Sequence, residues 1–341
     1  MSGMRAVVLH QTKDLDHLTL DTVPIPEPAP GEVRVRLKAA ALNHRDVWIV
    51  QGLYANIQLP VILGSDGVGV VDQVGDGVDP SWIGKAVIIN PSLNWGRNPR
   101  AQGKDYRILG MPDNGTHADW ITIGVNQVVP KPDYLPFAEA AAIPLAGLTG
   151  YRALFTQGKL TAGETVLLTG IGGGVAALML KMALAAGARV VVTSSSDEKI
   201  KKAVNAGAFG GANYREEGWF LHLQKLTAPH GIDLIVDSAG GNHFANLIQL
   251  VNPGGRIVFF GATAGNPSQL DLRRIFWKQI TLQGTTMGTE QDFYEMIRLF
   301  DTHKIKPIVD TTIPLENYRA AYERMLNGKQ FGKIVLVMEN D

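Results

Sequence analysis

The stretch "ETVLLTGIGGGVAALMLKMALAAGARVVVTSS", residues 164–195, decides the fold class. Its first part, 164–170, is an apolar run with the length of a buried strand, and it enters a glycine-rich turn. Residues 175–187 are rich in alanine, leucine and methionine and end in glycine, which is typical of a helix. A second apolar run, 188–195, follows directly. This order of strand, helix and strand predicts two parallel strands joined by a crossover helix.

The same alternation continues after this stretch. Residues 196–207 predict a second helix, because "SDEKIKKAVNAG" combines a polar start, a charged body and a final glycine. Three further apolar runs predict strands at 231–240, 254–263 and 279–286. We therefore expect an α/β protein in which residues 129–286 form a doubly wound parallel sheet.

Residues 1–128 follow a different pattern. "MRAVVLH" and "GEVRVRLKAAAL" are short alternating or apolar runs, and the proline-rich loop "VPIPEPAPGE" lies between them. An antiparallel, partly closed sheet fits this part of the chain. Residues 287–341 read as strand, helix and strand, and we expect them to rejoin this first domain.

Composition excludes several classes of function. Lysine plus arginine and aspartate plus glutamate both number 32, so the chain lacks the basic field that nucleic-acid binding needs. No apolar window approaches the 18 residues of a membrane span, and the N-terminus does not resemble a secretory signal. Cysteine is absent, which excludes disulfides and thiolate metal ligands. We expect a cytoplasmic protein that acts on a small molecule, without nucleic-acid or membrane partners.

The glycine-rich turn predicts a dinucleotide site. Glycine lets a pyrophosphate approach the backbone, and the following helix offers free N–H groups and the positive end of its dipole. The spacing is a loose form of the fingerprint, and an ordinary tight turn is the alternative. The strand before the turn, the helix and the second strand favour the dinucleotide. The expected cofactor contacts here are Gly170, Gly172, Gly173, Gly174 and Val175.

The end of the second strand favours NADP(H). NAD enzymes usually place an acid there to hold the ribose hydroxyls, whereas this strand ends in Ser194 and Ser195, with Lys199 within one helical turn. Hydroxyl groups and a lysine would receive the 2′-phosphate that an acid would repel. Two alternatives stay open. A serine of this run would also serve as the helix cap, and Asp197 would reach the ribose and restore a preference for NAD.

Several motifs together resemble the medium-chain dehydrogenase/reductase superfamily over nearly the whole chain. They are "NHRDVWIVQGLY", "GSDGVGVVDQVGDGV", "AAAIPLAGLTGYRAL", the glycine turn with its strands, "ANYREE", "VDSAGG" and "GKQFGKIVLV". The resemblance is to the zinc-free, quinone oxidoreductase-like branch. It implies a GroES-like, partly open β-barrel domain (1–128, rejoined by 287–341), a Rossmann domain (129–286), an active site in the cleft between them, and a homodimer paired through the edge strand that "ITLQGTTMG" resembles.

The resemblance also implies further cofactor contacts. A tyrosine after the third Rossmann strand, here Tyr214, helps to bind the 2′-phosphate in NADP-dependent relatives. Thr149 matches a position near the nicotinamide, and Gly261 ends a Rossmann strand where ligands gather. Phe331 and Lys333 match a tail segment that approaches the cofactor from the other side. Each of these residues also has a plain structural explanation as a turn or core residue.

Zinc-binding members of this superfamily differ from this chain at their metal ligands. They carry a cysteine where Asn43 stands, a His-Glu pair at Ser65 and Asp66, and a second cysteine near Leu145. Zinc requires three or four nitrogen, sulfur or oxygen ligands, which these residues do not supply as a set. We therefore expect no zinc. The alternative is an alcohol dehydrogenase-like enzyme that takes a metal through His44 and Asp66.

Without a Lewis acid, a quinone or an activated alkene (an enone or enal) is an easier substrate than an alcohol. Hydride adds to the electron-poor carbon, and the oxyanion that develops needs only hydrogen-bond donors. The expected catalytic residues are Asn43, Tyr54 and Asp46, the last more as an orienting group than as a base. A turn asparagine and a packing tyrosine are the structural alternatives. A nucleotide-binding protein without turnover, like the lens crystallins of this superfamily, is the third hypothesis.

Overall fold

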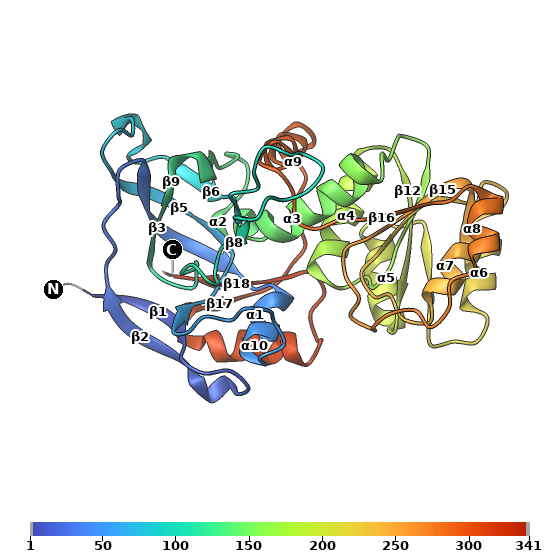
Figure 1. Ribbon diagram of the computed structural model, residues 1–341, viewed down its shortest axis with the longest axis horizontal. Coiled ribbons are helices and arrows are strands. Elements are labelled where there is room, and N and C mark those ends of the chain that lie inside the picture. Colours follow the sequence, from blue (N-terminus) through green and yellow to red (C-terminus); the bar gives the residue numbers. More distant parts are fainter. Residues whose placement is uncertain (1–2, 339–341) are drawn as a thin grey trace. The chain divides into compact units, whose positions relative to one another are not determined.

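The computed structural model describes residues 3–338, and these form two compact units (Figure 1). Unit 1 comprises residues 3–146, Thr289–Ile297 and 306–338, and unit 2 comprises Gly147–Gly288 and Arg298–Ile305. The ends of the expected first domain, residues 1–2 and 339–341, lie outside the described residues.

The chain leaves unit 1 later than the sequence pattern suggested, at residue 146 rather than 128. The reason is packing: α2 (Phe137–Ala141) contacts strands of unit 1, and it therefore stays with that unit. The helix α9 (Glu290–His303) is shared, because its first half belongs to unit 1 and residues 298–305 to unit 2.

Unit 2 contains a six-stranded parallel sheet in the order β13-β12-β11-β14-β15-β16. Valine, isoleucine and leucine fill the central strands, as expected for strands buried on both faces. The strands are β11 (Thr165–Leu168), β12 (Arg189–Ser194), β13 (Gly210–Asn213), β14 (Ile232–Asp237), β15 (Val251–Phe259) and β16 (Thr281–Gly284). The prediction of a doubly wound parallel sheet is confirmed.

Helices cover both faces of this sheet, with α4 and α5 on one face and α6, α7 and α8 on the other (Figure 1). The first helix ends where Gly187 takes a φ of 79°, the left-handed conformation that commonly stops a helix. The helices are α4 (Gly174–Ala185), α5 (Asp197–Asn205), α6 (Trp219–Thr227), α7 (Phe244–Leu250) and α8 (Leu272–Lys278). The helix α3 (Pro144–Tyr151) and a π-helical turn, Arg152–Gln157, precede the sheet.

Unit 1 is built on a seven-stranded sheet. Six of its strands have the order β10-β6-β5-β3-β18-β17, and the seventh, β9, pairs with β3. A smaller sheet has the order β2-β1-β4, and β7 pairs with β8. The strands are β1 (Gly3–Leu9), β2 (Leu18–Pro24), β3 (Glu32–Ala41), β4 (Val61–Ile62), β5 (Asp66–Val74), β6 (Ala86–Ile89), β7 (Ser92–Leu93), β8 (Arg107–Ile108), β9 (Trp120–Gly124), β10 (Val128–Pro130), β17 (Val309–Pro314) and β18 (Lys333–Val337).

The tail of the chain lies in unit 1. The strand β18 pairs antiparallel with β3 and parallel with β17. The helix α10 (Tyr318–Leu326) packs on these two strands and on α1 (His44–Val50). One apolar core unites these elements, with Leu37, Leu336 and Tyr322 among its fully buried side chains.

Within residues 3–338, every helix is too short or too polar to cross a lipid bilayer.

Candidate active site

The helix α1 begins at the quoted motif "NHRD" and fixes two of the predicted catalytic residues. Asn43 precedes the helix in extended conformation, and the Asp46 carboxylate accepts a hydrogen bond of 2.7 Å from the Asn43 backbone N–H. This bond satisfies one of the N–H groups left free at a helix start. Through this bond Asp46 holds the turn in place. Its side chain is fully buried and has no access to solvent.

Three neighbouring strands bring a lysine and an aspartate to the Asn43 side chain. Ala41 of β3 faces Val335 of β18 on one side and Asp66 of β5 on the other. Because alternate residues of a strand share a face, Lys333 and Asn43 lie on the same side as this row. The Lys333 ammonium donates to Asp66 Oδ2 at 2.8 Å, to Asn43 Oδ1 at 2.7 Å and to the Leu42 carbonyl at 2.7 Å.

The surroundings of the Asn43 amide leave it one orientation. Its oxygen faces the Lys333 ammonium, and its nitrogen donates to Asp66 Oδ2 at 2.9 Å. Rotating the amide would place an N–H against the ammonium and the oxygen against the carboxylate. The second Nδ2 hydrogen has no partner among residues 3–338, although Asn43 is only 7% exposed. One hydrogen of the Asn43 amide is therefore available as a donor at the predicted site.

Arg45, which is also buried, holds the loop that follows β8. Its guanidinium donates to Ser65 Oγ and to the Leu109 carbonyl, both at 2.8 Å, and to the Met111 carbonyl at 3.3 Å. The half-buried Tyr54 ring lies over the same guanidinium, with 5.1 Å from Cζ to the ring centroid. Tyr54, one of the expected catalytic residues, is therefore placed by a cation–π contact.

The residues at the zinc-ligand positions do not form a zinc site. Asp66 has both oxygens engaged, since Oδ1 accepts from the Leu145 N–H at 2.7 Å and Oδ2 from Asn43 and Lys333. Ser65 is bonded to Arg45, and a cation beside each of these groups opposes a second cation. In the described part of the chain, no three His, Asp or Glu side chains gather as a metal site would require.

Two buried titratable groups lie in the same unit and shift in opposite directions. Burial raises the pKa of the Asp46 carboxyl to about 6, although Arg45 and the Asn43 N–H oppose this change. Burial lowers the pKa of His117 to about 4. His117 Nδ1 lies 3.0 Å from the Tyr322 hydroxyl. At neutral pH the imidazole is therefore uncharged and Asp46 is mostly ionised.

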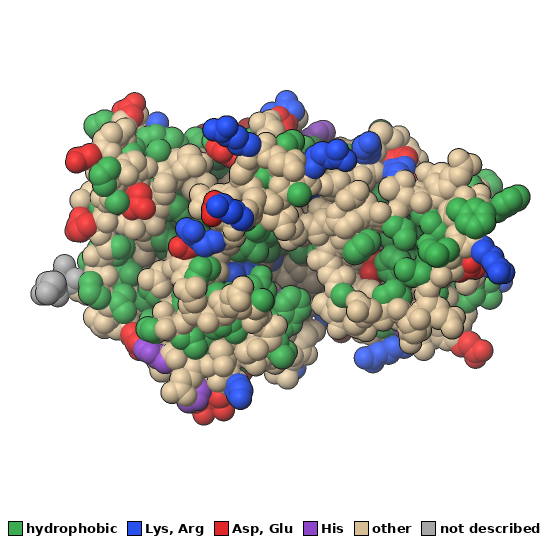
Figure 2. All heavy atoms as spheres, in the orientation of Figure 1, with side chains coloured by type: hydrophobic (Ala, Val, Ile, Leu, Met, Phe, Trp, Pro, Cys, Tyr) green, Lys and Arg blue, Asp and Glu red, His purple; other side chains and the backbone are tan. Residues whose placement is uncertain are grey.

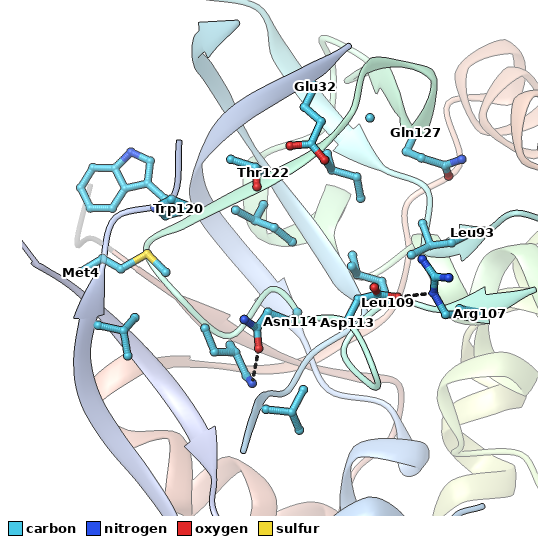
Figure 3. Close-up of a pocket in the computed structure, with 18 of the residues that line it drawn as sticks. Met4, Glu32, Leu93, Arg107, Leu109, Asp113, Asn114, Trp120, Thr122 and Gln127 are labelled. Atoms are coloured by element: carbon cyan, nitrogen blue, oxygen red, sulfur yellow. Dashed lines mark hydrogen bonds and ion pairs between the residues drawn. The ribbon is translucent and has the colours of Figure 1, made fainter. Parts of the chain in front are cut away.

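A separate pocket of about 630 Å³ opens elsewhere in unit 1 (Figure 3). Its wall carries the ion pair of Arg107 with Asp113 and the side chains of Met4, Trp120 and Gln127. The predicted catalytic residues are not part of its lining. This pocket is therefore distinct from the region around Asn43, Asp46 and Tyr54.

In unit 2 the glycine turn has the conformation that a phosphate cradle needs. Gly170 and Gly172 take φ values of 67° and 114°, which other residues rarely adopt. Gly173 is the N-cap of α4, and Gly174 and Val175 begin its first turn with the helix N-terminus free of a side-chain cap. The turn and the helix end fit a pyrophosphate.

The residues expected to bind the 2′-phosphate come together beside this turn. A methyl group built on Gly172 would lie 2.7 Å from Cδ and 3.3 Å from Nζ of Lys199. Ser194 pairs with Asn213 in the sheet, and the Tyr214 N–H donates to the Ser194 carbonyl at 3.0 Å. Ser195, Lys199 and Tyr214 are half-buried. The structure thus places Ser194, Ser195, Lys199 and Tyr214 at or shortly after the carboxyl ends of β12 and β13.

The two alternatives for this run of serines have different outcomes. Ser196 caps α5, since its hydroxyl accepts from the Lys199 N–H at 3.4 Å. Ser194 Oγ accepts from the Ser196 N–H at 3.2 Å. The Asp197 carboxylate accepts from Asn213 Nδ2 at 3.0 Å. This bond engages one oxygen of the exposed acid that the NAD alternative assigns to the ribose.

The remaining predicted cofactor residues are distributed over both units. In unit 2, Thr149 lies 3.6 Å from the sulfur of Met287, and a methyl group on Gly261 would meet the Ser238 carbonyl at 2.8 Å. In unit 1, Phe331 is buried and its N–H donates to Asp310. All three hydrogens of Lys333 have protein acceptors, which favours a role at Asn43 over a cofactor contact.

Sequence reasoning did not identify His117 and Tyr322 as part of this region, and it did not predict the partners of Arg45. Arg45 had a weak signal, because it lies inside "NHRD", but its partners at 109 and 111 are loop carbonyls that no pattern predicts. His117 and Tyr322 are 205 positions apart, and only the packing of α10 brings them together.

Comparison with known proteins covers both units. A family model described as an alcohol dehydrogenase GroES-like domain matches residues 29–133, and one described as a zinc-binding dehydrogenase matches residues 174–302. The first match agrees with the expected GroES-like fold of unit 1.

Three relatives carry names that bear on the chemistry. The zinc-type alcohol dehydrogenase-like protein YogA of Leptosphaeria maculans is 36% identical over 338 residues, which cover 94% of each chain. Acryloyl-coenzyme A reductase of Sulfurisphaera tokodaii is 30% identical and covers 98% of this chain and 99% of its own. Quinone oxidoreductase of Rattus norvegicus is 25% identical over 98% of both chains.

Among solved structures, an NAD-dependent alcohol dehydrogenase is similar to this chain with a TM-score of 0.92 and 37% sequence identity. The match covers 98% of this chain and 100% of that protein.

Proposed function

This chain is an oxidoreductase of the medium-chain dehydrogenase/reductase superfamily, and from that premise we propose that it transfers a hydride from NADPH to a quinone or an activated alkene without zinc. One observation carries the proposal. At two of the zinc-ligand positions the chain has an amide and a carboxylate, Asn43 and Asp66, which are bonded to each other and to the Lys333 ammonium. This group supplies a hydrogen-bond donor and no ligand set.

The contacts at the edge of the parallel sheet support NADPH as the coenzyme. The Lys199 side chain lies against the glycine turn, and the half-buried Ser195 and Tyr214 directly follow β12 and β13. An ammonium and two hydroxyl groups suit a phosphate dianion. Asp197, the acid that would favour NAD, is bonded to Asn213. Bound NADPH supplies the hydride, and Gly170–Val175 with the start of α4 hold its pyrophosphate.

The donor set selects the substrate class. Oxidation of an alcohol requires its hydroxyl to lose a proton, and a metal normally stabilises the alkoxide. Hydride addition to an electron-poor carbon instead creates an enolate or phenolate oxygen, which one or two N–H donors stabilise. The unused N–H of Asn43 is such a donor, whereas Asp66 and Ser65 are already committed to protein partners.

Each unit 1 residue has a distinct role in this proposal. Asn43 donates to the oxyanion, and Asp46 holds the backbone of Asn43 at the helix start. After hydride addition, Tyr54, placed over the Arg45 guanidinium, or a water molecule donates the proton that neutralises the product anion. Truncation of an oxyanion donor typically lowers kcat about 100-fold or more.

The names of two relatives support the substrate class. Acryloyl-coenzyme A is an alkene activated by a thioester carbonyl, and a quinone is an acceptor of the same electronic kind. We therefore include enoyl thioesters with enones, enals and quinones as candidate substrates.

Two other functions remain as alternatives to be tested. An alcohol dehydrogenase would need metal ligands at His44 and Asp66. However, His44 is exposed, whereas Asp66 is buried and both of its carboxylate oxygens accept hydrogen bonds from the protein. The similarity to an NAD-dependent alcohol dehydrogenase is the observation in its favour. A nucleotide-binding protein without turnover is the third possibility.

Oxidation of NADPH and NADH with a panel of quinones, enones, enals, acryloyl-coenzyme A, aldehydes and alcohols tests the proposal. We expect NADPH-dependent reduction of an activated alkene or quinone, with the same rate after treatment with a chelator. Chelator-sensitive alcohol oxidation with stoichiometric zinc in the protein would support the alcohol dehydrogenase instead. Coenzyme binding without turnover of any substrate would support the third alternative.

We further propose that the protein is a cytoplasmic homodimer. The unpaired edge of β16 at the end of the unit 2 sheet supports the dimer.

A further inference from the structure

Lys333 lies in a position to decide which way the Asn43 amide points. The Nζ atom is 2.7 Å from Asn43 Oδ1 and 2.8 Å from Asp66 Oδ2, and the lysine is only 2% exposed. An asparagine side chain has two orientations of nearly the same shape that exchange oxygen and nitrogen. The charges around it therefore choose between them.

We propose that Lys333 is a positioning residue that holds the Asn43 amide in the orientation in which its second N–H is free to donate. The part of this proposal that concerns substrate rests on the proposed function, in which Asn43 stabilises the oxyanion. The orientation itself does not depend on that function.

Asp66 alone is not sufficient for this task. Asp66 Oδ2 accepts from the nitrogen end of the Asn43 amide and leaves the oxygen end to another group. That group is the Lys333 ammonium, 2.7 Å from Oδ1, and an N–H turned toward it would meet donor hydrogens and no acceptor. Without the ammonium, no cation would oppose the reversed amide, and both orientations of Asn43 would be populated.

The ammonium has a second effect on the donor. A cation that accepts electron density from the amide oxygen polarises the group and makes its N–H groups stronger donors, because hydrogen bonds in a chain reinforce one another. Lys333 thus supports the developing negative charge through Asn43 without contact with substrate.

Kinetics of Lys333→Met test this role in the holoenzyme. We expect kcat to fall about 10- to 100-fold, the size of effect that a misplaced group produces, with little change in KM or in the coenzyme dissociation constant. In an Asn43→Ala background, Lys333→Met should cause no further loss of kcat, because both changes act through one amide. A full further loss in that background would overturn the proposal.

Two companion variants keep the test decisive. Asp66→Asn combined with Lys333→Met leaves no unpaired buried charge, so it folds where the single variant does not, and it should show the same fall in kcat. Lys131→Met is the matched control, since Lys131 also donates to two carbonyl groups in unit 1, those of Pro132 and Leu135, outside the site. Its kcat should equal that of the wild type.

Nitrogen-15 NMR of selectively labelled asparagine gives a readout that needs no substrate. In the wild type, the two Nδ2 hydrogens of Asn43 should give separate signals with slow solvent exchange. In Lys333→Met, or in the paired variant, these signals should shift and exchange faster, while in Lys131→Met they stay unchanged. Unchanged Asn43 signals without Lys333 would overturn the positioning role. Altered signals in a protein that turns over no quinone or alkene would refute the proposed function alone.

Discussion

Asp46 and His117 show how burial alone sets opposite charge preferences in one unit. Burial raises the pKa of Asp46 to about 6. Between pH 4 and 6 the folded protein therefore keeps a proton on Asp46 that the unfolded chain has lost. The free energy of unfolding consequently falls as the pH rises. For His117, with its pKa lowered to about 4, the unfolded chain binds the extra proton, so the free energy of unfolding rises with pH. Each contribution is on the order of 3 kcal/mol, at about 1.4 kcal/mol per pH unit, and the two nearly cancel.

Single substitutions should separate these two contributions. In Asp46→Asn, the amide oxygen still accepts from Asn43, and the free energy of unfolding should rise with pH between 4 and 6.5 by on the order of 3 kcal/mol more than in the wild type. In His117→Gln, the free energy of unfolding should fall with pH instead. Urea unfolding at half-unit pH steps measures both slopes. Slopes equal to that of the wild type in both variants would contradict the assignment.

Lys199 should determine the choice between coenzymes. Loss of a charge-assisted hydrogen bond to a phosphate costs about 1.5–3 kcal/mol, so Lys199→Ala should raise KM for NADPH about 10- to 100-fold and leave KM for NADH nearly unchanged. Lys202→Ala is the control, because Lys202 is on the same helix and pairs only with Glu198 in its exposed position. Steady-state kinetics with both coenzymes provide the measurement. Equal effects on NADPH and NADH would assign Lys199 to the pyrophosphate instead.

At the scale of single residues, the sequence predicted Asn43 and Asp46 because they lie within one short motif. It could not predict the partner of Asn43. Lys333 and Asp66 are 267 positions apart, and their contact follows from the register of β18, β3 and β5. A shift of one residue in either pairing would turn one of these side chains to the other face.

At the scale of elements, apolar runs predicted the central strands of unit 2 and the helices α4 and α5. Apolar runs did not predict β13, because its sequence, "GGAN", contains none, and its pairing with β12 makes it a strand. Only the family resemblance implied a strand before Tyr214. The helices α6 to α9 also went unpredicted. The helix α7 is seven residues long, which is too short for helical periodicity to stand out.

The loop after β8 depends on one buried arginine. Arg45→Met would leave Ser65 Oγ and the Met111 carbonyl without their donor, and the Leu109 carbonyl with the Ser65 hydroxyl alone, which should lower the free energy of unfolding by roughly 2–4 kcal/mol. Urea unfolding measures the loss, and limited proteolysis should show faster cleavage near residue 110. Arg107→Met is the control, because Arg107 is partly exposed and its ion pair with Asp113 contributes roughly 0–1 kcal/mol. Equal losses in the two variants would argue against anchoring by Arg45.

At the scale of the whole molecule, α8 carries large apolar side chains that solvent reaches. Leu272, Phe276 and Trp277 are 68%, 67% and 82% exposed, and hydrophobic atoms gather over the α8 region in Figure 2. Exposed apolar patches commonly mark interaction surfaces. This helix contacts β15, the strand next to the free-edged β16. A second copy of the chain is therefore the expected partner of this surface.

Charge placed on this surface should dissociate the dimer. We expect Phe276→Glu combined with Trp277→Glu to sediment as a monomer at concentrations where the wild type is a dimer, with an unchanged thermal unfolding midpoint at high dilution. Analytical ultracentrifugation measures the distribution. Leu221→Glu on α6, another exposed apolar position at 50%, is the matched control and should remain dimeric. A wild-type protein that sediments as a monomer throughout would contradict the prediction.

The distance along the chain between residues 66 and 333 has a consequence for biosynthesis. On the ribosome, Asp66 emerges long before Lys333, so a nascent chain carries a carboxylate whose counter-ion has not yet been translated. The amide of Asn43 gains its fixed direction only when β18 docks beside β3. Messages cut short between codons 306 and 333 would therefore encode all of unit 2 but would never yield a finished donor.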